Sequence, residues 1–87
     1  MARLKLSPAK YKALKIEIYE RDNYCCVHCG SPENPTAGHI VRRSQGGDDC
    51  ESNMVVQCVP CHIQFDKYEI EVPEEKLIEI GFYKEET

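Results

Sequence analysis

Four cysteines form two Cys-x-x-Cys pairs, a spacing at which one tight turn directs two thiolates at a single ion. The pairs are Cys26 with Cys29 and Cys58 with Cys61, and 28 residues separate them. Four thiolates complete a tetrahedral shell, which suits Zn²⁺ and leaves no open position for chemistry. The sequence therefore predicts one structural zinc site. A redox dithiol would instead need a Cys-x-x-Cys beside a βαβ unit, and no such unit is visible.

Two further cysteines and one histidine lie close to these pairs. Cys25 makes a poorer turn spacing with Cys29 than Cys26 does. We therefore predict that Cys25 and Cys50 are free thiols with a packing role. His28 lies inside the first pair and is expected to be a loop or supporting residue, because four thiolates already fill the shell.

Residues that can do chemistry lie between and just after the cysteine pairs. His39 is part of Ala-Gly-His-Ile-Val, Asn53 is part of Ser-Asn-Met-Val-Val, and His62 directly follows the last cysteine. Asp66 is four residues after His62, so both side chains project from one helix face and can share a divalent cation. Glu69 is a weaker candidate for the same role. Taken singly, these residues have simpler interpretations: a satisfied histidine, a turn asparagine and a surface ion pair.

In this combination and order, the motifs resemble the HNH endonuclease family, in particular its small phage-encoded members. The resemblance covers about residues 21–66, through Cys-x-x-Cys, Gly-His-Ile, Gly-Gly-Asp-Asp, Ser-Asn-Met and Cys-x-x-Cys-His. It implies an α+β chain with a ββα-metal fold. In that fold two antiparallel strands and a helix surround a catalytic divalent ion, and the zinc ribbon is a buttress.

The resemblance also implies roles for individual residues. His39 matches the general base, and Asn53 matches the residue that steadies the loop and orients that base. His62 matches a catalytic, metal-binding histidine, and Asp66 occupies the position of a further ligand. Family members commonly have a ligand just before the first histidine, where this chain has Gly38. Water and substrate phosphate must then complete the shell, which Mg²⁺ and Mn²⁺ tolerate.

Basic residues near these motifs are candidates for DNA binding. Arg42 and Arg43 follow His39 closely, and in an extended strand they face opposite ways, so at most one is expected to grip phosphate near the site. The first helix adds three lysines that either give sequence-independent affinity or form an ordinary exposed face: Lys10, Lys12 and Lys15. The charge is +4 over residues 1–43 and −8 over residues 44–87. A polyanion is therefore expected to meet the first half of the chain.

Capping and turn residues predict the elements that must position these side chains. Ser7-Pro8 begins a helix, and Gly46-Gly47-Asp48-Asp49 separates a strand at about 36–43 from one at 54–57. A further helix is predicted from about residue 60 to 70. We expect a single HNH domain over 1–87, with an N-terminal helix at about 7–21, an HNH core at about 22–70 and a C-terminal helix at about 73–80.

Length and composition exclude several other classes. With 87 residues, six Cys and no Trp, the chain can form only a small apolar core, so a bound structural metal ion is expected to stabilise the fold. No run approaches the roughly 18 apolar residues of a membrane helix, so no membrane partner is expected. The start, MARLKLSPAKYKALK, lacks the apolar stretch of a secretory signal. We therefore expect a cytoplasmic protein without disulfides, in the host cell if it is phage-encoded.

Together these features predict a metal-dependent endonuclease that nicks or cleaves DNA, with one structural Zn²⁺ and one catalytic Mg²⁺ or Mn²⁺. The chain is too short to contain a large module that reads DNA sequence. We therefore expect low intrinsic specificity for the sequence that is cut. The resemblance to phage members extends the prediction to phage DNA-packaging proteins as partners. The alternative is a non-catalytic zinc-ribbon module that binds nucleic acid or protein, which Gly38 and the acidic second half favour. The oligomeric state stays open.

Overall fold

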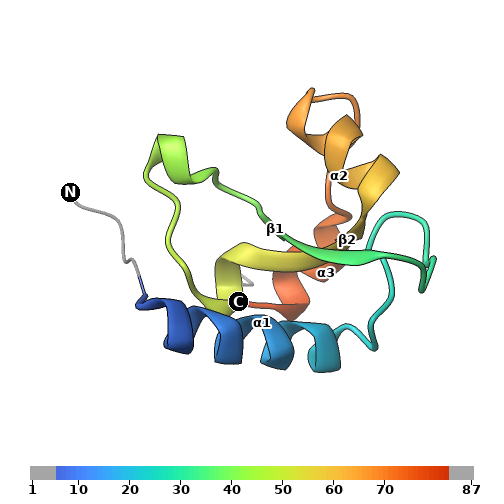
Figure 1. Ribbon diagram of the computed structural model, residues 1–87. Helices are drawn as coiled ribbons and strands as arrows, with labels where there is room; N and C mark the ends of the chain where they lie inside the picture. The colour runs from blue at the N-terminus through green and yellow to red at the C-terminus, as the bar shows by residue number, and fades with distance from the viewer. Residues whose placement is uncertain (1–5, 83–87) are drawn as a thin grey trace.

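Two antiparallel strands with helices on both sides form the centre of the molecule (Figure 1). The computed structural model describes residues 6–82. In chain order the helices and strands are α1 (Pro8–Arg21), β1 (Pro35–His39), β2 (Met54–Cys58), α2 (Val59–Asp66) and α3 (Glu74–Glu79), with short 3₁₀ turns at Arg43–Gln45 and Glu51–Asn53. This arrangement confirms the predicted α+β fold class. Within residues 6–82, no helix is long and apolar enough to cross a membrane.

Helix α1 begins at a capping pair and carries one apolar stripe. The Ser7 side chain accepts a hydrogen bond from the Lys10 N–H, and Pro8 occupies the first turn, where a missing N–H costs nothing. Leu14 and Ile18 lie one turn apart and are buried. The helix therefore packs on the sheet through this stripe and leaves its other faces to solvent.

The two strands pair in a register that sets which residues share a face. Pro35 lies opposite Cys58 at one end, and His39 lies opposite Met54 at the other. Successive side chains of a strand point to opposite faces of the sheet. His39 therefore ends β1 on the face that α1 covers, at the end of the sheet where the connection to β2 begins.

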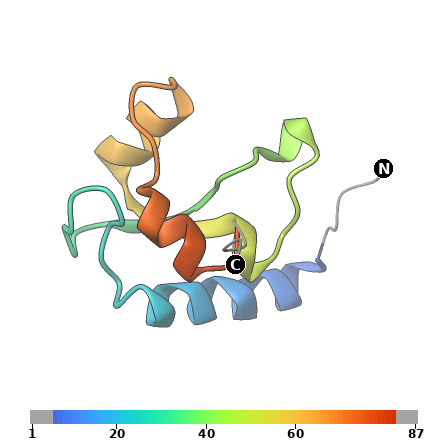
Figure 2. The ribbon, with the colours of Figure 1, turned by 180° about the vertical axis from the view of Figure 1, so that it is seen from behind.

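Strand β2 is buried along its whole length because helices cover both faces of the sheet. Met54 and Val56 pack against the apolar stripe of α1. On the opposite face Val55 packs with residues from α2, α3 and the segment between them: Phe65, Val72 and Leu77. Figure 2, the view from behind, shows α3 lying on that second side.

Strand β1 is shorter than the sequence predicted. It ends at His39 rather than Arg43, because the Asn53 side chain binds both the N–H and the C=O of Val41 in place of a strand partner. The chain then turns through Arg43–Gln45. The expectation that the two arginines face opposite ways along an extended strand is therefore wrong.

Helix α2 also ends earlier than predicted, at Asp66 instead of near residue 70. Tyr68 has a φ of 61°, a left-handed conformation through which an α-helix cannot continue. Glu69 consequently lies in the turn after the helix, away from the face that carries His62 and Asp66.

A buried carboxylate ties the end of α1 to the other layers. Asp22 accepts hydrogen bonds from Arg21 Nε at 2.9 Å and from the Val56 N–H of β2 at 3.0 Å. Lys76 Nζ of α3 lies 2.6 Å from the same carboxylate. Burial alone would raise the pKa of Asp22, but the hydrogen bonds from Arg21, Lys76 and Val56 outweigh it and hold the pKa below its usual value.

We expect Asp22→Ala to lower the free energy of unfolding by about 3 kcal/mol, because it leaves Lys76 and the Val56 N–H without this partner. Since the pKa of Asp22 is lower in the folded chain, its contribution is complete above about pH 4, the ordinary Asp pKa. The contribution is lost as the pH falls through the folded value. Urea unfolding of wild type and variant at neutral and acid pH measures both effects, and a stability gap that stays constant in acid contradicts the assignment.

Candidate metal centre and active site

The structure brings the four predicted cysteines together in one cluster, which we call the four-cysteine cluster. Cys26 and Cys29 lie in the turn after α1, Cys58 ends β2, and Cys61 lies in the first turn of α2. Their Sγ atoms all lie within 4.8 Å of one another. The Val27 N–H donates to the Val56 carbonyl at 2.9 Å and so docks the first turn on β2. This donor set and spacing fit a tetrahedral zinc ion.

Electrostatics of the cluster also favour a bound cation. Burial alone would raise the pKa of the Cys26 thiol, but backbone N–H groups of Cys58, Cys29 and His28 lower it to about 7. Burial, and then the neighbouring sulfurs, raise the pKa of Cys61. Four crowded thiols cannot all ionise without compensating positive charge, which a metal ion supplies on binding.

The remaining cysteines and His28 lie outside the cluster. Cys25 Sγ donates to the Asn23 carbonyl at 3.2 Å, and Cys50 Sγ lies 3.4 Å from Ser52 Oγ. His28 instead contacts protein groups through both ring nitrogens, with Nε2 2.8 Å from Gln57 Nε2 and Nδ1 3.1 Å from the Glu71 carbonyl. Burial lowers the pKa of His28. His28 therefore braces the first cysteine turn against β2 and the segment before α3.

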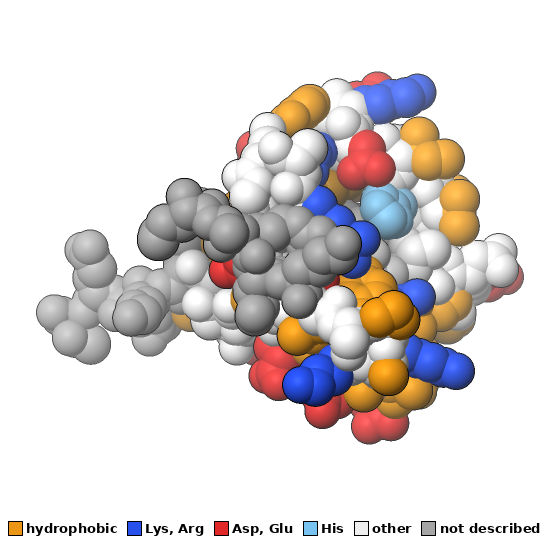
Figure 3. Space-filling model, turned by 60° about the vertical axis from the view of Figure 1, so that its left-hand side comes forward, with side chains coloured by type: hydrophobic (Ala, Val, Ile, Leu, Met, Phe, Trp, Pro, Cys, Tyr) orange, Lys and Arg blue, Asp and Glu red, His pale blue; other side chains and the backbone are white. Residues whose placement is uncertain are grey.

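A second site is a surface hollow of about 420 Å³ between α1, the β1–β2 connection and α2. Figure 3 shows an exposed histidine side chain with an acidic side chain beside it and Lys and Arg side chains close by. Residues that line the hollow include Tyr11, His39, Arg42, Arg43, His62 and Asp66. We call it the His39 hollow.

His39 is held in the hollow by a carboxylate that sequence reasoning missed. Its Nε2 lies 2.8 Å from Asp49 Oδ1, and the Asp49 side chain is only 1% exposed. The Tyr11 ring stacks on the His39 ring, with centroids 6.4 Å apart and planes 7° apart. Burial would raise the pKa of Asp49, but hydrogen bonds from His39 and the Leu6 N–H, with the charge of Arg43, lower it. Asp49 therefore stays ionised.

Asn53 fixes the connection that carries Asp49. Its Oδ1 accepts from the Val41 N–H at 2.8 Å, and its Nδ2 donates to the carbonyls of Val41 and Asp48, each at 3.0 Å. The buried amide thus pins both ends of the loop from residue 41 to residue 48. The position of Asp49 relative to His39 follows from these bonds.

His62 and Asp66 lie side by side on α2, as the i,i+4 spacing predicted. His62 Nε2 is 3.7 Å from Asp66 Oδ2, and both side chains are partly open to the hollow. An imidazole nitrogen beside a carboxylate oxygen is a donor set that fits a divalent cation. Glu69 is not one of the described residues that line this hollow.

Gly38 does not face the hollow. The missing side chain at Gly38 would point from the opposite face of β1 into the Gln57 side chain, and a Cβ there would collide with Gln57 Oε1. A side chain at this position would therefore have to displace the Gln57 side chain, and it would lie on the opposite face of β1 from His39. The two ligand candidates that the chain offers here are His62 and Asp66.

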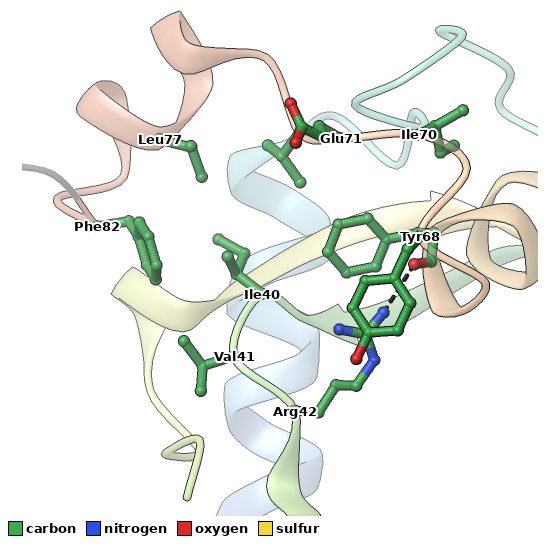
Figure 4. Close-up of a pocket in the computed structure, with 10 residues that line it drawn as sticks. Ile40, Val41, Arg42, Tyr68, Ile70, Glu71, Leu77 and Phe82 are labelled. Carbon is green, nitrogen blue, oxygen red and sulfur yellow. Dashed lines mark hydrogen bonds between the residues drawn. The ribbon is translucent and has the colours of Figure 1, made fainter. Parts of the chain in front are cut away.

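Both arginines line the hollow, with different partners. Arg42 donates through Nη2 to the Phe65 carbonyl at 2.7 Å, and its guanidinium lies 4.2 Å from the centre of the Tyr68 ring. Figure 4 shows this contact on the border of a neighbouring apolar pocket of about 320 Å³. Arg43 lies over the Tyr11 ring and has its Nε 3.4 Å from Asp49 Oδ1.

The three lysines of α1 lie at different distances from the hollow. Lys15 Nζ lies 5.8 Å from the centre of the Tyr11 ring, which itself lines the hollow. Lys10 and Lys12 are exposed. The contact with Tyr11 thus places Lys15 at the border of the hollow.

The order strand, loop, strand, helix, with one histidine ending the first strand and a histidine–carboxylate pair on the helix, defines a ββα-metal domain. The four-cysteine cluster buttresses the junction of β2 and α2. Residues 26–65 match the family model described as HNH endonuclease. This part of the chain is thus similar to the HNH endonuclease domain, a family whose name denotes nuclease chemistry. Comparison with curated proteins and with solved structures gives no significant match.

Proposed function

We propose that this protein is a metal-dependent endonuclease that hydrolyses phosphodiester bonds in DNA, with Zn²⁺ in the four-cysteine cluster as a structural ion. The observation that carries the proposal is that one hollow contains both His39, with Asp49 behind it, and the His62–Asp66 pair. Hydrolysis needs a base for the attacking water and positive charge for the phosphate. The hollow offers candidates for both.

His39 is the proposed base. Ionised Asp49 accepts the Nε2–H of the ring, which leaves the lone pair of a neutral imidazole on Nδ1. Stacking on Tyr11 and the bond to Asp49 hold the ring in place, so little reorganisation accompanies proton transfer. When Nδ1 takes a proton from water, the negative charge of Asp49 stabilises the imidazolium that forms.

His62 and Asp66 are the proposed ligands of the catalytic cation, Mg²⁺ or Mn²⁺. When bound there, such an ion supplies Lewis-acid stabilisation of the charge on the phosphate and the leaving oxygen. Two protein ligands leave room for water and phosphate oxygens, which hard cations prefer. Arg42 adds fixed positive charge, because the Phe65 carbonyl and the Tyr68 ring restrain its guanidinium.

Substrate binding in this proposal depends on the DNA backbone. Arg42 and Arg43 reach phosphate in the hollow, and the lysines of α1, led by Lys15, contact flanking phosphates. Contacts to phosphate carry no sequence information, so low intrinsic specificity is part of the proposal. We further propose that the protein acts with phage DNA-packaging proteins in the cytoplasm of a host cell. The support for this role is the resemblance to phage-encoded members of the family.

Incubation with supercoiled plasmid tests the activity. Relaxed or linear products are expected with Mg²⁺ or Mn²⁺, and none with a chelator or with Zn²⁺ alone. A gel-shift assay on zinc-loaded protein without added Mg²⁺ or Mn²⁺ measures DNA binding separately. Binding without cleavage under every metal condition would favour the non-catalytic zinc-ribbon alternative.

Asp49→Asn tests how His39 is oriented. The asparagine amide can donate to Nε2, which moves the ring proton to Nδ1 and removes the lone pair that the proposed base needs. We expect the nicking rate to fall by at least about 10²-fold, since the same change in other His–Asp pairs costs about 10⁴-fold. DNA binding should not change. Asp48→Asn is the matched control, because the Asp48 side chain is exposed; equal activity of the two variants contradicts the role of Asp49.

A further inference from the structure

Thr36 on β1 connects the sheet to His62 on α2 through one hydroxyl group. Thr36 Oγ1 lies 2.6 Å from the Gln57 carbonyl oxygen and 2.8 Å from His62 Nδ1. A carbonyl oxygen can only accept, so the single hydroxyl hydrogen of Thr36 points at Gln57. The Thr36 oxygen then faces His62 as an acceptor, and His62 Nδ1 must carry a hydrogen.

The opposite ring nitrogen is therefore the one with a free lone pair. In a neutral imidazole only one nitrogen is protonated, so His62 Nε2 presents its lone pair at 3.7 Å from Asp66 Oδ2. Two acceptors then face each other across a gap open to the His39 hollow. Arg42 Nε approaches the other carboxylate oxygen, Asp66 Oδ1, at 4.0 Å, so the pair of acceptors is left facing each other.

We infer that Thr36 is a positioning residue that fixes the tautomer and ring orientation of His62 and thereby presents Nε2 to a divalent cation. The inference rests on the proposed function, in which His62 is a ligand of that cation. The other tautomer would set the Nδ1 lone pair against Thr36 Oγ1 and turn an Nε2–H toward Asp66. A hydrogen bond would then occupy the gap in which the cation binds.

The first test is the nitrogen and carbon NMR spectrum of the His62 ring, which distinguishes the two neutral tautomers. Spectra are recorded on zinc-loaded protein without other divalent ions at about pH 8.5, well above the ordinary imidazole pKa of about 6.5. We expect the Nδ1–H form in wild type and in Thr36→Ser, which keeps the hydroxyl. In Thr36→Val, which keeps the shape and the β-branching, we expect a shift toward the Nε2–H form. An Nε2–H ring in wild type overturns the inference, whether or not the valine variant folds.

The second test is Mn²⁺ binding, followed by electron paramagnetic resonance in the absence of DNA. Loss of the bond that orients a metal-binding histidine typically weakens affinity about 10- to 100-fold. We expect at least a tenfold higher Kd for Thr36→Val and a wild-type Kd for Thr36→Ser. Equal Kd values in all three proteins overturn the inference. If Thr36→Val shows both changes but wild-type protein does not cut DNA, the inference holds and the proposed function fails.

Discussion

The His39→Ala variant is expected to nick supercoiled plasmid about 10²- to 10⁴-fold more slowly than wild type, the loss that removal of a general base typically causes. In the structure the His39 ring is held between Tyr11 and Asp49 at the edge of a hollow that also contains His62 and Asp66. A plasmid nicking assay on the two purified proteins measures the effect.

Two controls separate loss of the base from loss of the fold. Zinc content and melting temperature of His39→Ala should stay near wild type, because Asp49 keeps its ion pair with Arg43 and the hydrogen bond that it accepts from the Leu6 N–H. Ser44→Ala alters another residue of the same hollow and should keep its activity. If His39→Ala retains most of the nicking activity, the base lies elsewhere and the assignment of the hollow is wrong.

Replacement of Cys58 by serine is expected to abolish stable folding. Cys58 ends β2 one residue before α2 begins, and its Sγ lies 3.6 Å from Cys29 Sγ in the four-cysteine cluster. Structural zinc contributes about 10–16 kcal/mol in small zinc domains, which exceeds or matches the whole stability of about 5–15 kcal/mol of a typical domain. Circular dichroism and metal analysis of the purified variant should show an unfolded, zinc-free chain.

The chain contains matched controls for this experiment. Cys25 and Cys50 are half-buried thiols outside the cluster, so Cys25→Ser and Cys50→Ser should keep the zinc and the fold. In wild type these two thiols should react with a thiol reagent while the four cluster cysteines are protected. A folded Cys58→Ser protein, or a wild-type protein without metal, would refute the zinc assignment.

Residues whose roles depend on local spacing could be predicted from the sequence. The Cys-x-x-Cys pairs and the i,i+4 pair of His62 and Asp66 need only a turn or one helix turn to bring their atoms together. The structure places both sets as expected. Capping by Ser7 and Pro8 likewise depends on neighbours in the chain.

Residues whose roles depend on the path of the connection could not be predicted in the same way. Asp49 ends a Gly-Gly-Asp-Asp segment whose composition is typical of an exposed turn. Its side chain is nevertheless buried against His39, ten residues earlier in the chain. Thr36 meets His62 across 26 residues. The lengths of β1 and α2 were overestimated for a related reason: the Asn53 side chain and the backbone of Tyr68 decide where they end.

The way Asn53 brackets its loop has a consequence for engineering. Hydrogen bonds to Val41 and Asp48 set the spacing of the loop ends, whereas the tip, residues 44–46, is exposed and projects away from the sheet in Figure 1. Added length at an exposed tip costs little. A short DNA-reading peptide grafted at this tip would extend beside the His39 hollow while the bracket keeps the reactive side chains in place. In the proposed endonuclease, the loop is thus a site at which a sequence preference could be introduced.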